Sequence, residues 1–297
     1  MNLKKYFTVN FYHRLFINSI ALLFLIQLYS CCSKSDSDSL PIYVDFEASP
    51  IGDYSPKKIR TDWPNSKMLW GKKDRVEYTL GLTPKYAEIL DHKGNRVLRV
   101  NYPANVYGPL VGSQWKSAFH SVDEAVLQYK VFFPVGFDFA KGGKLPGLAG
   151  GKGNAGGQVP NGYDGWSARL MFHEHGEVAY YLYYPDQKTE YGEYHFWKLD
   201  STEIQLPVGR WVEFTHYLRM NNPKQRDGKL CAWIDGVKVL SIDSLRFRDT
   251  SALAIDHILF STFYGGDSPE WAPYKDTYIL FDDFCIKIPD STFVISE

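Results

Sequence analysis

Residues 166–184 read WSARLMFHEHGEVAYYLYY, which is two apolar runs on either side of a short polar turn. Side chains alternate within each run, and those at even positions are the more apolar. The even positions hold Trp166, Ala168, Leu170 and Phe172, then Val178, Tyr180, Leu182 and Tyr184. Alternation with a period of two is typical of half-buried β-strands. We therefore predict a β-hairpin whose even positions face the core.

The turn of this hairpin sets its register. Residues 174–176 (EHG) form a three-residue connection with glycine at the left-handed position, which is a common hairpin geometry. This turn pairs Arg169 with Tyr181 and Ser167 with Tyr183, and directly opposite residues share a face with their Cβ atoms about 5 Å apart. A shift of one residue would bury Arg169, so the pattern favours this register. A guanidinium, two phenols and a hydroxyl thus converge on one open face.

These polar groups suit an anionic sugar, because a guanidinium holds a carboxylate through two hydrogen bonds and a phenol can move a proton. An ordinary sheet surface with cross-strand aromatic pairs has the same pattern. Gln114 and Trp115 in VGSQWKS could line a subsite, since tryptophan offers a stacking face, or could simply pack in a strand. We expect His173 and His175 to be exposed at the hairpin tip and not catalytic.

Three segments, KLPGLAGG, WSARLMF and YYLYYPDQ, resemble polysaccharide lyase family 14, which contains alginate and glucuronan lyases. The resemblance extends over residues 44–288 and includes NNPKQRDGKLCAWIDGVKV and FSTFYGGDSPEWAP. In that family a lysine in K-L-P-G-L, a Ser-x-Arg pair and a Tyr-x-Tyr pair line the active cleft. The matching positions are Lys144, Ser167 with Arg169, and Tyr181 with Tyr183. Gly165-Trp166 and Phe172-His173 depart from the family pattern, which puts the substrate in doubt more than the reaction.

The resemblance implies β-elimination on a uronic-acid polymer. Removing the C5 proton builds negative charge on the neighbouring carboxylate, which Arg169 or Lys144 would stabilise where it develops. Tyr181 and Tyr183 would act as base and acid in an order that the sequence leaves open, and Ser167 would position the sugar. A tyrosine base needs a nearby cation to lower its pKa from about 10, and Arg169 opposite Tyr181 would provide one.

The remaining chain predicts an all-β fold. Strands are expected at 42–47, 97–102, 125–133, 211–220, 230–234, 237–242, 257–264 and 277–288, with a two-residue hairpin turn at Asp235-Gly236. Residues 50–80 read as an irregular insertion, 147–165 as a glycine-rich loop, and 85–90 as a possible short helical turn. We also expect Lys144 to lie in this loop region, where it would either complete the site or be an ordinary solvated residue. Many short strands separated by turns indicate a two-sheet antiparallel sandwich. The family resemblance implies a concanavalin-like jelly roll with a concave substrate cleft, filling a domain from residue 41 to 297.

Composition narrows the function classes. The 297 residues carry a net charge of −1, which does not suggest nucleic acid as a partner. Tyrosine, phenylalanine and tryptophan number 21, 19 and 8, which suits β-structure and sugar stacking. No spacing suggests a metal site, the glycine run lacks a phosphate-loop signature, and we expect no cofactor.

Cys231 and Cys285 lie in predicted strands, where either could be a buried thiol; whether they pair stays open. We expect a monomer.

The N-terminus reads as a targeting segment. Lys4, Lys5 and Arg14 precede an apolar run at 15–28, which is short for a transmembrane helix and typical of a signal peptide. Leu28-Tyr29-Ser30-Cys31 resembles a bacterial lipoprotein cleavage box, which predicts a signal peptide over 1–30 and lipidation of Cys31. A polar tether, 31–40, follows. We expect an exported lipoprotein of the outer membrane or cell surface, held to the membrane by its lipid alone; a simple secretory signal or an uncleaved anchor is the alternative.

Two other functions stay open. A glycoside hydrolase on a similar sandwich needs two carboxylates about 5–10 Å apart, and the hairpin places neither Asp nor Glu on its polar face. A non-catalytic surface protein could bind an acidic polysaccharide through the same arginine and aromatic groups without cleaving it. The sequence also leaves open which uronate polymer is bound and whether cleavage is endo or exo.

Overall fold

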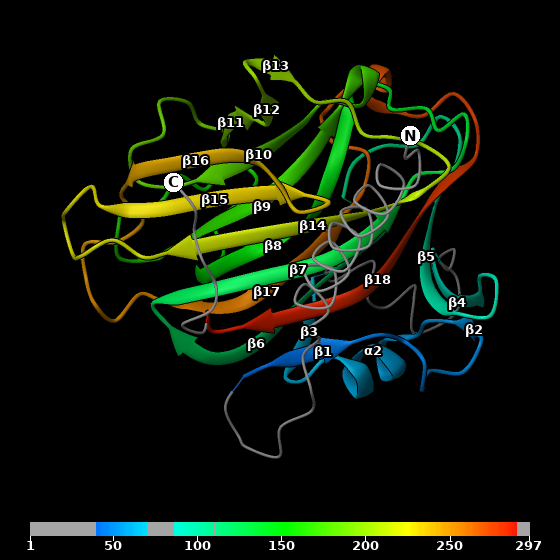
Figure 1. Cartoon of the computed structure of the whole chain (residues 1–297), viewed down its shortest axis with the longest axis horizontal. Coiled ribbons are helices and arrows are strands. Elements are labelled where there is room, and N and C mark those ends of the chain that lie inside the picture. The colour runs from blue at the N-terminus through cyan, green and yellow to red at the C-terminus, as the bar shows by residue number, and fades with distance from the viewer. Residues whose placement is uncertain (1–39, 70–85, 110, 290–297) are drawn as a thin grey trace, which may run out of the picture. The chain divides into compact units, whose positions relative to one another are not determined.

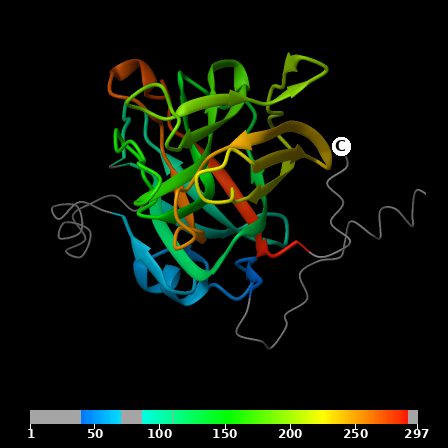
Figure 2. The ribbon, with the colours of Figure 1, turned by 90° about the vertical axis from the view of Figure 1, so that its left-hand side faces the viewer.

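A computed structural model describes residues 40–69, 86–109 and 111–289 of the chain (Figure 1). Within these ranges nearly all regular structure is β, arranged as two antiparallel sheets that enclose one hydrophobic core (Figure 2). The predicted two-sheet sandwich is confirmed. The signal segment, Cys31 and most of the tether lie outside the described residues. Among the described residues, no helix has the length and apolar character needed to cross a membrane.

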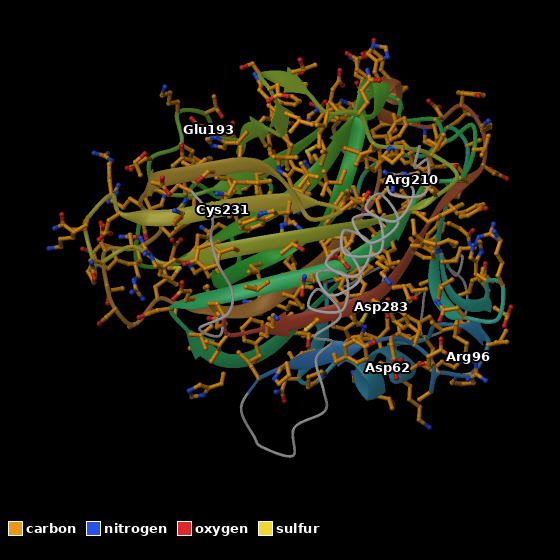
Figure 3. All side chains as sticks on the ribbon, viewed as in Figure 1. Asp62, Arg96, Glu193, Arg210, Cys231 and Asp283 are labelled. Atoms are coloured by element: carbon orange, nitrogen blue, oxygen red, sulfur yellow. The ribbon has the colours of Figure 1, made fainter. Side chains whose placement is uncertain are left out.

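The first sheet has the order β16-β15-β14-β7-β18-β5-β4-β2, and β1 also pairs with β18. Its strands are β16 (Val237–Leu245), β15 (Gly228–Ile234), β14 (Trp211–Arg219), β7 (Glu124–Phe132), β18 (Thr277–Lys287), β5 (Arg96–Tyr102), β4 (Ala87–Asp91), β2 (Gly52–Asp53) and β1 (Ile42–Val44). Cys231 on β15 and Cys285 on β18 are buried thiols that do not form a disulfide with each other (Figure 3 labels Cys231).

The second sheet carries the polar face predicted from the hairpin. Its order is β11-β10-β9-β8-β17-β6-β3, with β11 and β10 at the top of Figure 1 and β6 and β3 at the bottom. Its strands are β11 (Glu193–Phe196), β10 (Val178–Tyr183), β9 (Gly165–His173), β8 (Gly142–Gly151), β17 (Ile255–Thr262), β6 (Ser113–Val122) and β3 (Ser66–Met68). A separate small ribbon pairs β12 (Lys198–Leu199) with β13 (Thr202–Glu203).

The core between the sheets is dominated by large aromatic side chains. Trp115 of β6 stacks on Phe260 of β17 with ring centroids 3.8 Å apart, and the indole of Trp63 packs edge-on against both rings. Tyr180 crosses from the second sheet to the first and hydrogen-bonds His216 of β14 at 2.8 Å. Burial of this apolar area contributes about 25 cal/mol per Å² and is the main force that holds the sheets together.

Residues 50–80 are not wholly irregular as predicted, because a short helix, α2 (Pro56–Asp62), lies within them. Ser55 caps it by accepting a hydrogen bond from the Lys58 amide, and Pro56 stands at the first helical position, where its missing N–H costs nothing. The helix ends at Trp63, whose buried side chain anchors it to the core. The predicted helical turn at 85–90 is wrong, since residues 87–90 belong to strand β4; residue 85 lies outside the described residues.

The glycine-rich segment also differs from the prediction. Its first part belongs to β8, and a loop occupies only residues 152–164. Glycine is required in this strand because neighbouring backbone lies close. A Cβ on Gly147 would come within 2.0 Å of the Ala168 carbonyl oxygen, and one on Gly150 within 2.0 Å of the Ala254 carbonyl oxygen. The strand therefore packs more tightly than side chains would allow.

Candidate active site

The β9–β10 hairpin has the predicted register. Arg169 lies opposite Tyr181, and Ser167 lies opposite Tyr183. All eight even-position side chains named from the sequence belong to the hydrophobic core. The polar face therefore points away from the core.

The turn of the hairpin spans the three predicted residues, Glu174–Gly176, and the amide of His173 donates a hydrogen bond to the Glu177 carbonyl at 2.7 Å. His175 and Gly176 both adopt left-handed backbone conformations, with φ of 62° and 84°. The prediction that His173 is exposed is wrong, because its ring is half-buried against Tyr194 and Phe196 of β11. Burial lowers the pKa of His173 to about 4, so this imidazole is neutral near pH 7.

A cavity of about 630 Å³ opens on the polar face of the second sheet. Its walls come from the hairpin, the start of β8, β11, and loops that follow β17 and β8. The lining residues are Pro109, Gln114, Lys144, Ala155, Gly156, Arg169, Tyr181, Tyr183, Tyr191, Tyr194, Phe263, Gly266, Asp267 and Trp271. Arg169, both phenols and Lys144 are thus brought together as predicted, from three neighbouring strands.

Lys144 lies on strand β8, opposite Met171 of β9, and not in a loop as its glycine-rich surroundings suggested. Its side chain is only 8% exposed. The Nζ atom lies 3.5 Å from the centre of the Tyr181 ring and contacts the Met171 sulfur, a weak acceptor. Among the described residues no carboxylate pairs with it. Burial, then the charge of Arg169, holds the pKa of Lys144 well below its usual value, which favours a neutral amine.

Arg169 is buried and has a single hydrogen-bond partner among the described residues. Its side chain is 4% exposed, and Nη1 donates a hydrogen bond to the Ser261 hydroxyl at 3.4 Å, while Nε has no partner among the described residues. Burial lowers the pKa of Arg169, and Tyr183 and Tyr181 oppose that shift. A guanidinium remains charged in proteins, so the cavity presents a cation with unused hydrogen-bond donors.

The two phenols lie side by side. Their oxygens are 3.3 Å apart, and the amide of Gly157 donates to the Tyr183 oxygen at 3.2 Å. Tyr194 stacks on Tyr181, with ring centroids 5.0 Å apart. The expectation that Arg169 lowers the pKa of Tyr181 is wrong in net direction. Burial raises that pKa most, the hydrogen bond with Tyr183 raises it further, and the opposing effect of Arg169 is smaller. Tyr181 is therefore protonated at neutral pH.

Two residues predicted to contact the substrate, Trp115 and Ser167, do not line the cavity. Trp115 points into the core and is fully buried against Phe260, so it offers no face to a sugar. Ser167 lies on the correct face, but its buried hydroxyl donates a hydrogen bond to the Asn154 carbonyl at 2.6 Å. The loop 152–164 covers it, so Ser167 anchors this loop and does not line the cavity.

Gln114 does line the cavity, and it also supports the arginine. Its side-chain oxygen accepts from the Ser261 hydroxyl at 3.0 Å, while its nitrogen donates to the Pro109 carbonyl at 2.7 Å. Ser261 is in turn the partner of Arg169. The chain of contacts fixes the arginine from the β6 side of the sheet.

Several cavity residues were not predicted from the sequence: Tyr191, Tyr194, Phe263, Asp267 and Trp271. Tyr194 could have been found, because β11 pairs with β10 and places it opposite Tyr181. The others lie in loops or beyond strand ends, where alternation gives no signal. Within the described parts of the chain, no group of three histidine, cysteine or acidic residues is arranged to hold a metal ion.

Comparison with known proteins identifies the family. The model of the polysaccharide lyase 14 family matches residues 91–284, and the chain belongs to this family. Exolysin of Paramecium bursaria Chlorella virus 1 is 26% identical over 187 residues, which cover 54% of this chain. The chain spans only 28% of the length of that viral protein.

Two solved structures illustrate the shared fold. Alginate lyase Aly36B superposes with a TM-score of 0.70 at 24% identity, covering 84% of this chain and 98% of that enzyme. Alginate lyase vAL-1 from Chlorella virus superposes with a TM-score of 0.59 at 25% identity, covering 68% of this chain and 89% of the viral enzyme. The jelly-roll sandwich implied by the sequence is confirmed by this likeness.

Proposed function

We propose that the protein is a lyase that cleaves a uronate polymer of the alginate or glucuronan type by β-elimination. One observation carries this proposal: Lys144, Arg169, Tyr181 and Tyr183 meet in one cavity, in a member of polysaccharide lyase family 14. A base, an acid and a fixed positive charge are the three groups that the elimination requires. The name of vAL-1, an alginate lyase, supports a uronate as the substrate.

Arg169 is suited to hold the substrate carboxylate. Arg169 lines the cavity, its Nε has no partner among the described residues, and a carboxylate can accept two parallel hydrogen bonds from a guanidinium. The charge is fixed before the substrate arrives, so little reorganisation is needed as negative charge develops on the carboxylate during proton removal.

Lys144 is suited to be the base and Tyr181 the acid. The neutral amine takes the C5 proton, and the electrons of the C5–H bond form a C4–C5 double bond while the C4–O4 bond breaks. The Tyr181 hydroxyl then gives its proton to O4, which leaves as the new chain end. Tyr183, held by the Gly157 amide and hydrogen-bonded to Tyr181, stabilises the phenolate that forms. No water is consumed, and proton exchange with solvent restores both groups.

Substrate binding would itself strengthen this base. In the free protein the charge of Arg169 contributes to the low pKa of Lys144. A carboxylate bound to Arg169 offsets that charge, so the proton affinity of the amine rises only once a substrate is in place. Substrate binding would therefore make this amine a stronger base than it is in the free protein.

The alternatives make different products. A glycoside hydrolase needs two carboxylates, and Asp267 is the single acid among the described residues that line the cavity. Incubation with polymannuronate, polyguluronate and glucuronan separates the three functions. Ultraviolet absorbance from the unsaturated product indicates a lyase, reducing ends without that absorbance indicate a hydrolase, and binding without either indicates a non-catalytic protein. Absence of the absorbance with all three polymers would contradict the proposal.

We further propose that the protein is exported and anchored through a lipid on Cys31. The support is the sequence alone, namely the apolar run at 15–28 that ends in Leu28-Tyr29-Ser30-Cys31 and the polar tether that follows.

A further inference from the structure

A row of neighbouring residues, paired except at one bulge, runs across the second sheet from the candidate active site to its far edge. From β10 to β3 the row holds Tyr181, Arg169, Gly147, Leu259, Lys116 and Lys67. Arg169 and Gly147 meet at a bulge in β8, where a Cβ on Gly147 would lie 2.6 Å from the Arg169 Cα. The row therefore crosses six neighbouring strands, in the direction from top to bottom of this sheet in Figure 1.

Both lysines of this row belong to the face that carries the cavity. Lys116 is two residues from Gln114, which lines the cavity, and Trp115 between them points into the core. Lys67 lies directly opposite Lys116, and its neighbour Met68 packs against the core. Since strand side chains alternate between faces, both ammonium groups project from the active-site face.

Two lysines directly opposite each other destabilise a sheet by mutual repulsion. Two other strand lysines have acidic partners: Lys130 lies 2.7 Å from Asp283 and Lys229 lies 3.1 Å from Asp243. Lys67 is exposed and Lys116 half-exposed, and neither forms an ion pair or side-chain hydrogen bond with another described residue. The pair thus offers two positive charges with no counter-charge among the residues that the structure describes.

We infer that Lys67 and Lys116 form a distal subsite for carboxylates of the same uronate chain that enters the active site, and this inference rests on the proposed function. Strands are about 4.8 Å apart, so β6 and β3 lie roughly 14 and 19 Å from β9, which carries Arg169. That separation exceeds one sugar ring. A uronate polymer, with one carboxylate on each sugar, can contact Arg169 and the lysine pair at once if it lies across the strands along the row.

The experiment compares long and short substrates. The double variant Lys67→Gln/Lys116→Gln is assayed on the uronate polymer that the wild type cleaves fastest and on a trisaccharide to pentasaccharide series of the same uronate. An exposed ion pair contributes about 0.2–1 kcal/mol, so losing two should raise KM for the polymer roughly two- to thirtyfold, with kcat unchanged. The shortest oligosaccharides should be unaffected, and the salt dependence of the polymer KM should weaken.

Two matched variants control this comparison. Lys67→Arg/Lys116→Arg keeps the charges and should retain the wild-type KM. Lys93→Gln/Lys224→Gln removes two exposed lysines from turns outside the second sheet and should leave the polymer KM unchanged. Thermal unfolding of all variants verifies that each is folded.

The inference would be overturned if the polymer KM of the Lys67→Gln/Lys116→Gln variant were unchanged. It would also be overturned if KM rose equally for the shortest oligosaccharides, or if the turn-lysine control showed the same rise in polymer KM. Binding of the three polymers to wild type and variants, measured by titration calorimetry, separates this result from the proposed function. A wild type that binds a polymer without cleaving it contradicts the lyase proposal. In that case, a weaker affinity of the Lys67→Gln/Lys116→Gln variant still supports the subsite, and an equal affinity or no binding at all overturns it.

Discussion

Replacing Lys144 by methionine should change activity and stability in opposite directions. Methionine has a similar length, is unbranched and apolar, and can keep the contacts with Met171 and the Tyr181 ring. It cannot accept a proton. Removal of a general base typically costs about 10²–10⁴-fold in rate, so kcat should fall by at least about 100-fold.

The stability change follows from the pKa of Lys144, which burial holds well below the value of about 10.4 in an unfolded chain. Between these two pKa values the unfolded chain binds more protons than the folded one, so the free energy of unfolding rises with pH by up to about 1.4 kcal/mol per unit. The penalty of burying the amine is complete below the folded pKa and disappears above about pH 10.4. Methionine removes it, so Lys144→Met should be more stable than wild type at neutral pH.

The measurement is urea unfolding of wild type and Lys144→Met at a series of pH values, together with product formation. The difference in unfolding free energy should be largest at low pH and shrink toward pH ~10. Lys93→Met, on an exposed turn, is the control and should alter neither quantity. A Lys144→Met variant with near wild-type turnover would refute the base assignment. A variant less stable than wild type at neutral pH would show that burial of the amine does not lower the free energy of unfolding.

Three further outcomes are expected. Tyr181→Phe should reduce turnover by about 10²-fold or more with little change in stability, and Tyr183→Phe should reduce it less; full activity of both would exclude tyrosine as the acid. Arg246 donates a hydrogen bond at 2.7 Å to Asp186, in the loop after β10, and so supports one wall of the cavity. Arg246→Met should raise KM roughly two- to tenfold and lower the melting temperature. Unchanged KM and melting temperature would contradict this role. Cys31→Ser should release the protein from the membrane fraction, and a variant that stays bound and unprocessed would contradict lipidation.

The sequence predicted the hairpin and its register because two constraints coincide there. Alternation assigns each side chain to a face, and the short turn fixes which residues are opposite, so Arg169 and the two phenols meet without any knowledge of the remaining strands. The same alternation should have excluded Trp115. Consecutive strand residues point to opposite faces, so Gln114 and Trp115 cannot both line one cavity.

Other features of the site depend on contacts between distant segments. Ser167 is on the predicted face, but the loop 152–164 covers it, and the path of a loop is not encoded in strand periodicity. Lys144 was assigned to a loop because glycine is common in turns, whereas here Gly147 and Gly150 serve close packing of backbone. The burial that sets the pKa values of Lys144 and Tyr181 likewise depends on all the walls of the cavity.

The charge balance of the cavity bears on which polymers the site accepts. Arg169 is buried, keeps a donor without a partner, and has no carboxylate counter-charge among the described residues. An unpaired buried charge is costly, and a substrate carboxylate relieves that cost by supplying the missing anion. A neutral glycan of the same shape would also displace the solvent around Arg169, but it would supply no anion. Its binding would therefore include the cost of desolvating the guanidinium, with no ion pair to offset that cost. The site therefore selects uronates by rejecting neutral sugars as well as by attracting the carboxylate.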